Sequence, residues 1–410
     1  MSPYAVLAGL LLLAWAAHSV AQPRERRGLG LSSGTEFLLA GLLLGPTGAD
    51  LITVPALHTM APITLAAASW LALLAGSHLG RTHARPGPPH RRALGLALSM
   101  AVFCVCAALC WELAPLVLPL PGHERLYLAL GLACAASETA RAAIVWSAEQ
   151  TGARGPLQHA LMDFAEEDDI VPLLGLAALF AIAPRAASVA VLHAPVAAFI
   201  ATLGVGAVMG TLASVLVNIE TRRSARWVIV IGTAALVTGA TARAGLAAPA
   251  ALMTMGATLN LMSTHGRRLH DVLAATARPV LLPVIAIAGA SLDLNDSASL
   301  WLIIALVPIA RLIVKVPVAA ALRRRLAPPN IPTRGVGLAL LACGPITVCV
   351  GLTVAAGFPG AIGHLVLTAS LVSIVFGDIV GRLALRHELK RANEWAPARH
   401  RSSDDAGAAP

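Results

Sequence analysis

The chain has 410 residues, of which 57% are hydrophobic and 12% are charged, and its mean hydropathy is +0.76. Soluble globular domains carry about 25% charged residues, so this composition excludes a soluble protein and predicts a polytopic membrane protein. The net charge of +9 comes from arginines in short loops between apolar runs, where they face anionic lipid headgroups, so nucleic-acid binding is not expected.

Apolar runs predict where the chain crosses the membrane. A crossing needs about 20 mostly apolar residues, and on this criterion the chain forms about thirteen helices. In chain order they cover residues 3–21, 36–53, 60–79, 93–118, 126–148, 157–183, 188–217, 227–243, 246–263, 277–293, 299–321, 335–356 and 361–384. The first run also resembles a signal peptide, but Arg24, Arg26 and Arg27 follow it and no basic residue precedes it, which favours a retained helix.

The remaining composition indicates neither a cofactor nor an enzyme. The six cysteines lie inside apolar runs without regular ligand spacing, so neither a disulfide framework nor a zinc site is expected. At the predicted membrane depth there is no HExxH-type metal motif and no nucleophile beside a base. The chain is therefore expected to work without a cofactor and without catalysing a reaction.

Arginines in the loops predict the orientation, because Lys and Arg accumulate on the cytoplasmic side. If the N-terminus lies outside, the cytoplasmic loops hold the arginines at 24–27, 81–92, 154, 222–226, 267–268 and 323–334. The opposite loops hold only Arg125, Arg185 and Arg243. This alternation predicts an N-terminus outside and a C-terminus inside. Residues 1–386 are predicted to form the transmembrane domain, and residues 387–410 a short disordered cytoplasmic tail.

The richest cluster of acids within a predicted crossing is Glu166, Glu167, Asp168 and Asp169. An ionisable group at membrane depth costs several kcal/mol unless it is paired, hydrated or neutralised. If 157–183 is one helix, Asp168 lies roughly 16 Å along it, about half of a 30 Å hydrocarbon core. The alternative is a loop of solvated acids, but then the apolar run after Asp169 is too short to cross.

Basic residues at membrane depth provide counter-charges for these acids. Arg141 lies in the preceding crossing, and Arg311 and Lys315 lie one helical turn apart in the eleventh. They can pair with the acids, or their long side chains can reach back to the membrane interface. The second alternative suits Lys315 better than Arg311, which lies closer to mid-depth.

The fifth crossing contains a polar stretch, Ser137, Glu138 and Thr139, halfway along an otherwise apolar run. A helix that unwinds at the midplane exposes carbonyl and hydroxyl oxygens that can bind a dehydrated cation. The stretch therefore predicts a broken helix and an ion site. A hydrogen-bonded patch between helices is the alternative for the serine and threonine, but it accounts less well for Glu138.

Five segments in this order resemble the cation:proton antiporter superfamily, particularly its monovalent cation:proton antiporter-2 branch. They are residues 40–46 (AGLLLGP), 137–139 (SET), 152–170, 288–294 (AGASLDL) and 312–315 (LIVK). Each motif is weak alone, but their order and spacing fit the predicted topology. The resemblance implies an inverted-repeat fold with a panel domain, a six-helix core domain and crossed broken helices. It also implies a homodimer in a bacterial inner membrane.

The resemblance further implies roles for individual residues. Asp169 would be the main ligand of a monovalent cation and of protons, with Asp168 as its partner. Lys315 would be the basic residue that pairs with an acid, and Thr139 would line the cation site. The residues that depart from the family pattern are Glu138, Arg141, Glu166, Glu167 and Arg311.

The resulting hypothesis is a secondary antiporter that exchanges Na⁺ or K⁺ for H⁺ by alternating access at a buried acidic pair. Carboxylate and carbonyl oxygens suit Na⁺, Li⁺ or K⁺ without choosing among them. One alternative is an organic-anion carrier of similar fold in which Arg141 and Arg311 bind the solute. Another is a membrane sensor that does not transport.

Overall fold

The computed structural model describes residues 34–79, 89–151, 153, 155–165, 168–183, 194–293, 297–326 and 336–394. All regular structure in these residues is helical, which confirms the predicted all-α class. The helices are α2 (Thr35–Leu44), α3 (Val54–His78), α4 (Pro89–Val117), α5 (Gly122–Ser137), α6 (Arg141–Thr151), α7 (Pro156–Phe164), α8 (Ile170–Ile182), α9 (Pro195–Ile219), α10 (Arg223–Arg243), α11 (Ala248–Met262), α12 (Gly266–Ala290), α13 (Ala298–Leu326), α14 (Val336–Ala339), α15 (Pro345–Gly357), α16 (Ala361–Phe376) and α17 (Arg382–Arg391). A π-helical turn, Gly377–Gly381, joins α16 to α17.

Each predicted crossing from 36–53 to 361–384 contains helical residues. Within the described ranges, seven helices are long and apolar enough to cross a membrane. The predicted first crossing, 3–21, lies outside the described residues, as do Glu166, Glu167 and most of the predicted tail. The number of crossings and the orientation of the termini therefore stay predictions.

Three of the predicted crossings are interrupted. Residues 126–148 divide into α5 and α6, as the polar stretch predicted, and residues 335–356 divide into α14 and α15. The prediction of one continuous helix over 157–183 is wrong. Helix α7 ends at Phe164, and Asp168 and Asp169 form a turn before α8. Neighbouring carboxylates on one helix surface repel one another, which disfavours helix at this acidic stretch.

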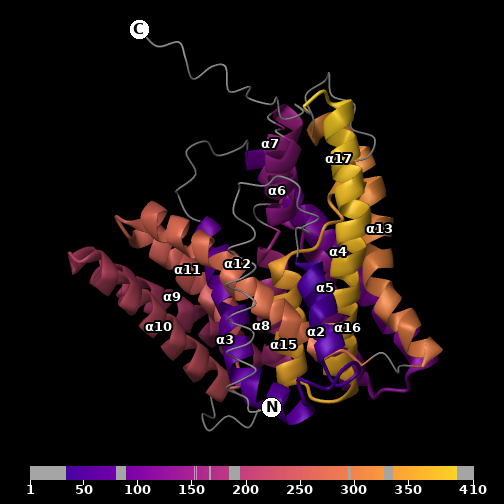
Figure 1. The fold of residues 1–410 in the computed structure, drawn as a ribbon, viewed down its shortest axis with the longest axis horizontal. Helices are drawn as coiled ribbons and strands as arrows, with labels where there is room; N and C mark the ends of the chain where they lie inside the picture. The colour runs from indigo at the N-terminus through magenta and orange to yellow at the C-terminus, as the bar shows by residue number, and fades with distance from the viewer. Residues whose placement is uncertain are drawn as a thin grey trace.

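The helices pack in two groups (Figure 1). In the first group, α11 packs against α3 and α9, α10 covers α9 and α11, and α2 and α12 pack together beside α3. In the second group, α4, α5, α8, α13, α15 and α16 surround the interruptions. Contacts of α3 with α15 and of α8 with α9 join the two groups.

Glycines allow α2 and α12 to approach closely. A Cβ atom at Gly41 would lie 1.9 Å from the carbonyl oxygen of Ala286, and one at Gly289 would lie 2.2 Å from that of Leu38. Small residues permit such backbone contact between membrane helices, where dispersion rather than the hydrophobic effect favours association. The two glycine-containing segments singled out in the sequence, 40–46 and 288–294, therefore pack against each other.

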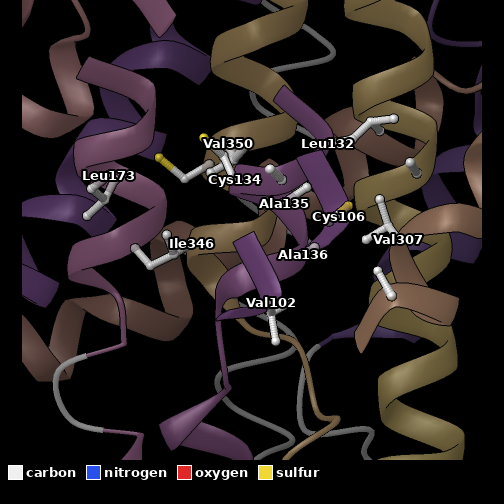
Figure 2. Close-up of a cluster of buried hydrophobic side chains, with 14 of the residues drawn as sticks. Val102, Cys106, Leu132, Cys134, Ala135, Ala136, Leu173, Val307, Ile346 and Val350 are labelled. Carbon is white, nitrogen blue, oxygen red and sulfur yellow. The ribbon is translucent and has the colours of Figure 1, made fainter. Parts of the chain in front are cut away.

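A buried apolar cluster holds the second group together around the interruption that follows α5 (Figure 2). The members labelled in Figure 2 come from α4, α5, α8, α13 and α15, and they are Val102, Cys106, Leu132, Cys134, Ala135, Ala136, Leu173, Val307, Ile346 and Val350. Both cysteines are free thiols that fill space in this cluster. The packing holds the ends of α5 and α15 next to each other.

The C-terminal region is more ordered than predicted. Helix α17 continues past the predicted boundary at 386 to Arg391, and Leu389 is buried. The carboxylate of Glu394 then accepts hydrogen bonds from the backbone N–H groups of Leu157 (2.6 Å) and Gln158 (3.0 Å). These donors lie in the first turn of α7, where N–H groups have no partner within the helix. Residues 387–394 therefore belong to the folded domain.

Candidate functional site

Two extended segments cross in the protein interior, one from each broken helix. Residues 138–140 separate α5 from α6, and residues 340–344 separate α14 from α15. The backbone N–H of Ala140 donates to the carbonyl oxygen of Ala342 at 2.9 Å, which joins the two segments at their crossing. Four helix ends thus meet in the interior, where their unpaired N–H and C=O groups need partners.

Glu138 supplies the acceptors for the N-terminus of α15. Its carboxylate accepts from the backbone N–H groups of Gly344 (3.3 Å), Ile346 (3.2 Å) and Thr347, and from the Thr347 hydroxyl. Pro345 occupies the first helical position, where its missing N–H costs nothing. The side chain of Glu138 is 1% exposed. This anion therefore offsets the positive end of a helix dipole in the interior.

Arg311 supplies donors for the opposite ends of α5 and α14. Its Nη1 donates to the carbonyl oxygen of Ala136 at 2.6 Å. Its Nη2 donates to the carbonyl oxygens of Leu341 (3.0 Å) and Ala342 (3.2 Å). One planar guanidinium therefore joins the C-terminal ends of two half-helices, where positive charge is favourable.

Lys315, one turn further along α13, bonds to the same two chain segments. Its Nζ donates to the carbonyl oxygens of Glu138 (2.9 Å) and Leu340 (3.2 Å) and to the Thr139 hydroxyl (2.7 Å). The side chain is fully buried within the protein. The alternative in which Lys315 reaches back to the membrane interface is therefore wrong.

The Thr139 hydroxyl accepts from the Lys315 ammonium at 2.7 Å, and both residues interact electrostatically with Asp168. Asp168 is 2% exposed, and its Oδ1 has no hydrogen-bond partner among the described residues. A buried acceptor atom without a partner is rare and costly, and it marks the most direct place for a cation or a proton to bind.

Asp169 occupies the last position before α8 and is only partly buried. It interacts electrostatically with Glu138, Asp168 and Arg141. Arg141 opens α6 and hydrogen-bonds through Nη1 to Nδ1 of His78 on α3 at 2.7 Å. Arg141 therefore connects the acids to the other group of helices.

Ser99 on α4 is a further polar residue that contacts the interrupted segments. Its hydroxyl lies 3.0 Å from the carbonyl oxygen of Ser137 and 3.2 Å from that of Asp168. The side chain is 1% exposed. The hydroxyl thus reaches two of the interrupted segments at once.

Another buried acid lies next to the second interruption. Asp378, in the π-helical turn, accepts a hydrogen bond from the Thr35 hydroxyl on α2 and is 1% exposed. The backbone of the same turn packs on the second interruption, since a Cβ at Gly377 would lie 2.8 Å from the Cys343 nitrogen. Such π-helical turns occur frequently at functional sites.

The structure brings together most residues predicted from the sequence. Ser137, Glu138, Thr139, Asp168, Asp169, Arg141, Arg311 and Lys315 lie on or beside the interrupted segments. Glu166 and Glu167 fall outside the described residues. Sequence reasoning missed Ser99, Thr347 and Asp378. Thr347 had a signal in the Gly344-Pro345 pair that marks the start of a helix just before it. Asp378 had one as well, because it is an ionisable residue inside the predicted crossing 361–384.

Comparison with known proteins identifies the architecture. The sequence matches no protein-family model and no curated protein. The fold is similar to that of the sodium proton antiporter MjNhaP1 from Methanocaldococcus jannaschii at pH 8, with a TM-score of 0.66, 14% identity, and coverage of 96% of this chain and 99% of that chain. A structure from an electron-microscopy map of MjNhaP1 gives a TM-score of 0.62 at 15% identity, covering 96% and 98%. This similarity confirms the antiporter-type fold that the sequence predicted, and it concerns the fold alone.

Proposed function

We propose that the chain is a secondary antiporter that exchanges a monovalent cation for protons, with Asp168 and Asp169 as the acids that alternately hold the two. The single observation that carries this proposal is the buried Oδ1 of Asp168, which has no hydrogen-bond partner among the described residues. It lies beside the crossing of two broken helices, the arrangement that membrane transporters use to bind ions at mid-depth.

The hydrogen bonds of the other charged groups support this assignment. The Glu138 carboxylate accepts hydrogen bonds from the N-terminus of α15. The Arg311 guanidinium donates to carbonyl oxygens at the ends of α5 and α14. These two groups therefore position the helix ends. Asp378 accepts from the Thr35 hydroxyl beside the second interruption, so Asp168 and Asp169 are the acids that we assign to exchange at the first.

Competition for one acidic site is a sufficient mechanism. A carboxylate that holds either a cation or a proton can be exposed to each side in turn, whereas the empty, charged site crosses poorly because desolvation is costly. A proton gradient then drives cation transport. Movement of the second helix group against the first would provide the alternating exposure.

The likeness to a sodium proton antiporter makes Na⁺ the first cation to test, with K⁺ and Li⁺ as alternatives. The proposal extends to a homodimer in a bacterial inner membrane, with the N-terminus outside, and to the antiporter-2 branch. An organic-anion carrier is less well supported, because Arg311 already binds three backbone carbonyls.

The test is cation-induced proton movement in inverted membrane vesicles that contain the protein. A proton gradient is imposed and followed with a pH-sensitive dye, and Na⁺, Li⁺, K⁺ or an organic anion is then added. The proposal predicts that at least one monovalent cation collapses the gradient, while vesicles without the protein stay unchanged. A response to carboxylates alone, or no response to any solute, would contradict it.

A further inference from the structure

Ser99 makes an unusual pair of contacts. Its hydroxyl lies within hydrogen-bonding distance of the carbonyl oxygens of Ser137, at the end of α5, and of Asp168, in the turn before α8. These residues belong to two different interrupted crossings, and Ser99 comes from a third, uninterrupted helix, α4. One side chain therefore bridges backbone oxygens of two interrupted crossings.

The number of protons in this contact is smaller than the number of acceptors. A serine hydroxyl has one proton to donate, whereas both carbonyl oxygens accept. The Ser99 proton can therefore satisfy only one of the two carbonyl oxygens fully, and a cation is a ligand that the other can bind. Asp168, which supplies one of these carbonyls, also has a carboxylate Oδ1 without a partner among the described residues.

The backbone of α4 is built for this approach. Gly95 lies one turn before Ser99, and a Cβ atom there would lie 2.3 Å from the carbonyl oxygen of Phe164, the last residue of α7. Only glycine fits at this distance, so α4 is held tightly against the end of α7. This contact places Ser99 near the interrupted segment, and the Ser99 hydroxyl makes the contact with Asp168 itself.

We infer that Ser99 is a positioning residue of the ion site, whose hydroxyl fixes the separation of the Ser137 and Asp168 carbonyl oxygens and so determines which size of monovalent cation the site prefers. This inference rests on the proposed exchange function. Discrimination between ions of one charge depends on the number and spacing of the oxygens that replace water. Removal of the hydroxyl leaves the carbonyls free to separate.

The test compares Ser99→Ala with wild-type protein in proteoliposomes, with the apparent KM for Na⁺, Li⁺ and K⁺ measured at one pH. Ser99→Ala is expected to raise the apparent KM for the preferred ion about fivefold, the factor for losing one hydrogen bond of net worth about 1 kcal/mol. The maximal rate should change little, and the ratio of the KM values for two ions should move towards one. Ser99→Thr, which keeps the hydroxyl, should restore the wild-type ratio.

Ser69→Ala is the matched control, because Ser69 on α3 is fully buried and its hydroxyl has no hydrogen-bond partner among the described residues. This variant should keep the wild-type KM values. If wild-type protein exchanges cations and Ser99→Ala keeps both the KM and the ion ratio, the role of Ser99 is wrong and the exchange function stands. If the wild-type protein moves no cation, both proposals fail.

Discussion

Glu138 and Thr347 lie on different broken helices and are joined twice. The Glu138 carboxylate accepts hydrogen bonds from both the backbone N–H and the hydroxyl of Thr347. The two residues are 209 positions apart in the sequence. Hydrogen bonds to a buried charged group are stronger than those between neutral groups, so this contact fixes the crossing of the two helices.

Replacement of Glu138 should therefore act mainly on the stability of the folded protein, and not directly on ion binding. Glu138→Ala leaves the N–H groups of Gly344, Ile346 and Thr347 without their acceptor, a loss on the order of 3 kcal/mol for a buried charged partner. Glu138→Gln keeps one acceptor oxygen and should lose less. Thermal melting in detergent measures both. Glu112→Ala, at an exposed position on α4, serves as the control, and equal melting of all variants would refute the capping role.

Arg311 should not tolerate lysine. The guanidinium reaches the carbonyl oxygens of Ala136 and Leu341 with two separate nitrogens, whereas a lysine ammonium is a single point. Arg311→Lys keeps the charge but loses the hydrogen bond to one of the two helix ends, so this variant should melt at a lower temperature than wild type. Arg243→Lys, at an exposed position in the last turn of α10, is the matched control. Wild-type melting of Arg311→Lys would show that charge alone suffices.

The Thr139 hydroxyl is predicted to tune ion affinity, because it accepts a hydrogen bond from Lys315 and interacts with Asp168. Thr139→Val removes the hydroxyl at nearly constant volume and should raise the apparent KM for the transported cation several-fold, whereas Thr139→Ser should behave like wild type. Transport in proteoliposomes gives the KM. Thr241→Val provides the comparison, since the Thr241 hydroxyl bonds, among the described residues, only carbonyls of its own helix. An unchanged KM in Thr139→Val would remove Thr139 from the site.

The loop arginines predict the topology. A reporter inserted after Arg222, and another at the end of the chain, should both lie in the cytoplasm. A reporter at Gly245, in the turn between α10 and α11, should lie outside. If the reporter after Arg222 is found outside, the predicted orientation is reversed.

Hydropathy was sufficient to locate helical segments from 36–53 to 361–384, because the need for apolar length acts on each segment separately. The polar stretch 137–139 also predicted the first interruption. The second interruption was not located, since Leu340, Leu341, Ala342 and Cys343 are apolar and only Gly344-Pro345 marks it. The acidic stretch was placed on a continuous helix because the apolar residues on both sides outweighed the repulsion between neighbouring carboxylates.

The hydrogen-bond partners of the charged residues could not be predicted from local sequence patterns. Glu138 was expected to bind the ion, yet its donors lie more than 200 residues away, in α15 and the segment before it. Lys315 was expected to pair with an acid, but its ammonium donates to two carbonyl oxygens and the Thr139 hydroxyl. Its role as a counter-charge to Asp168 stays a prediction. The difference arises because helix ends inside a membrane protein need partners that only the assembled fold provides.

The most direct test of the proposed exchange is sodium uptake into proteoliposomes driven by a proton gradient, measured for the wild type, Asp169→Asn and Asp168→Asn. Wild-type protein should accumulate Na⁺ while protons leave. Each asparagine variant should lose uptake while it melts as a folded protein, because a neutral amide cannot exchange a proton for a cation. Asp271→Asn, at an exposed position near the start of α12, should transport normally. Sodium uptake by Asp169→Asn equal to that of the wild type would contradict the assignment of the site.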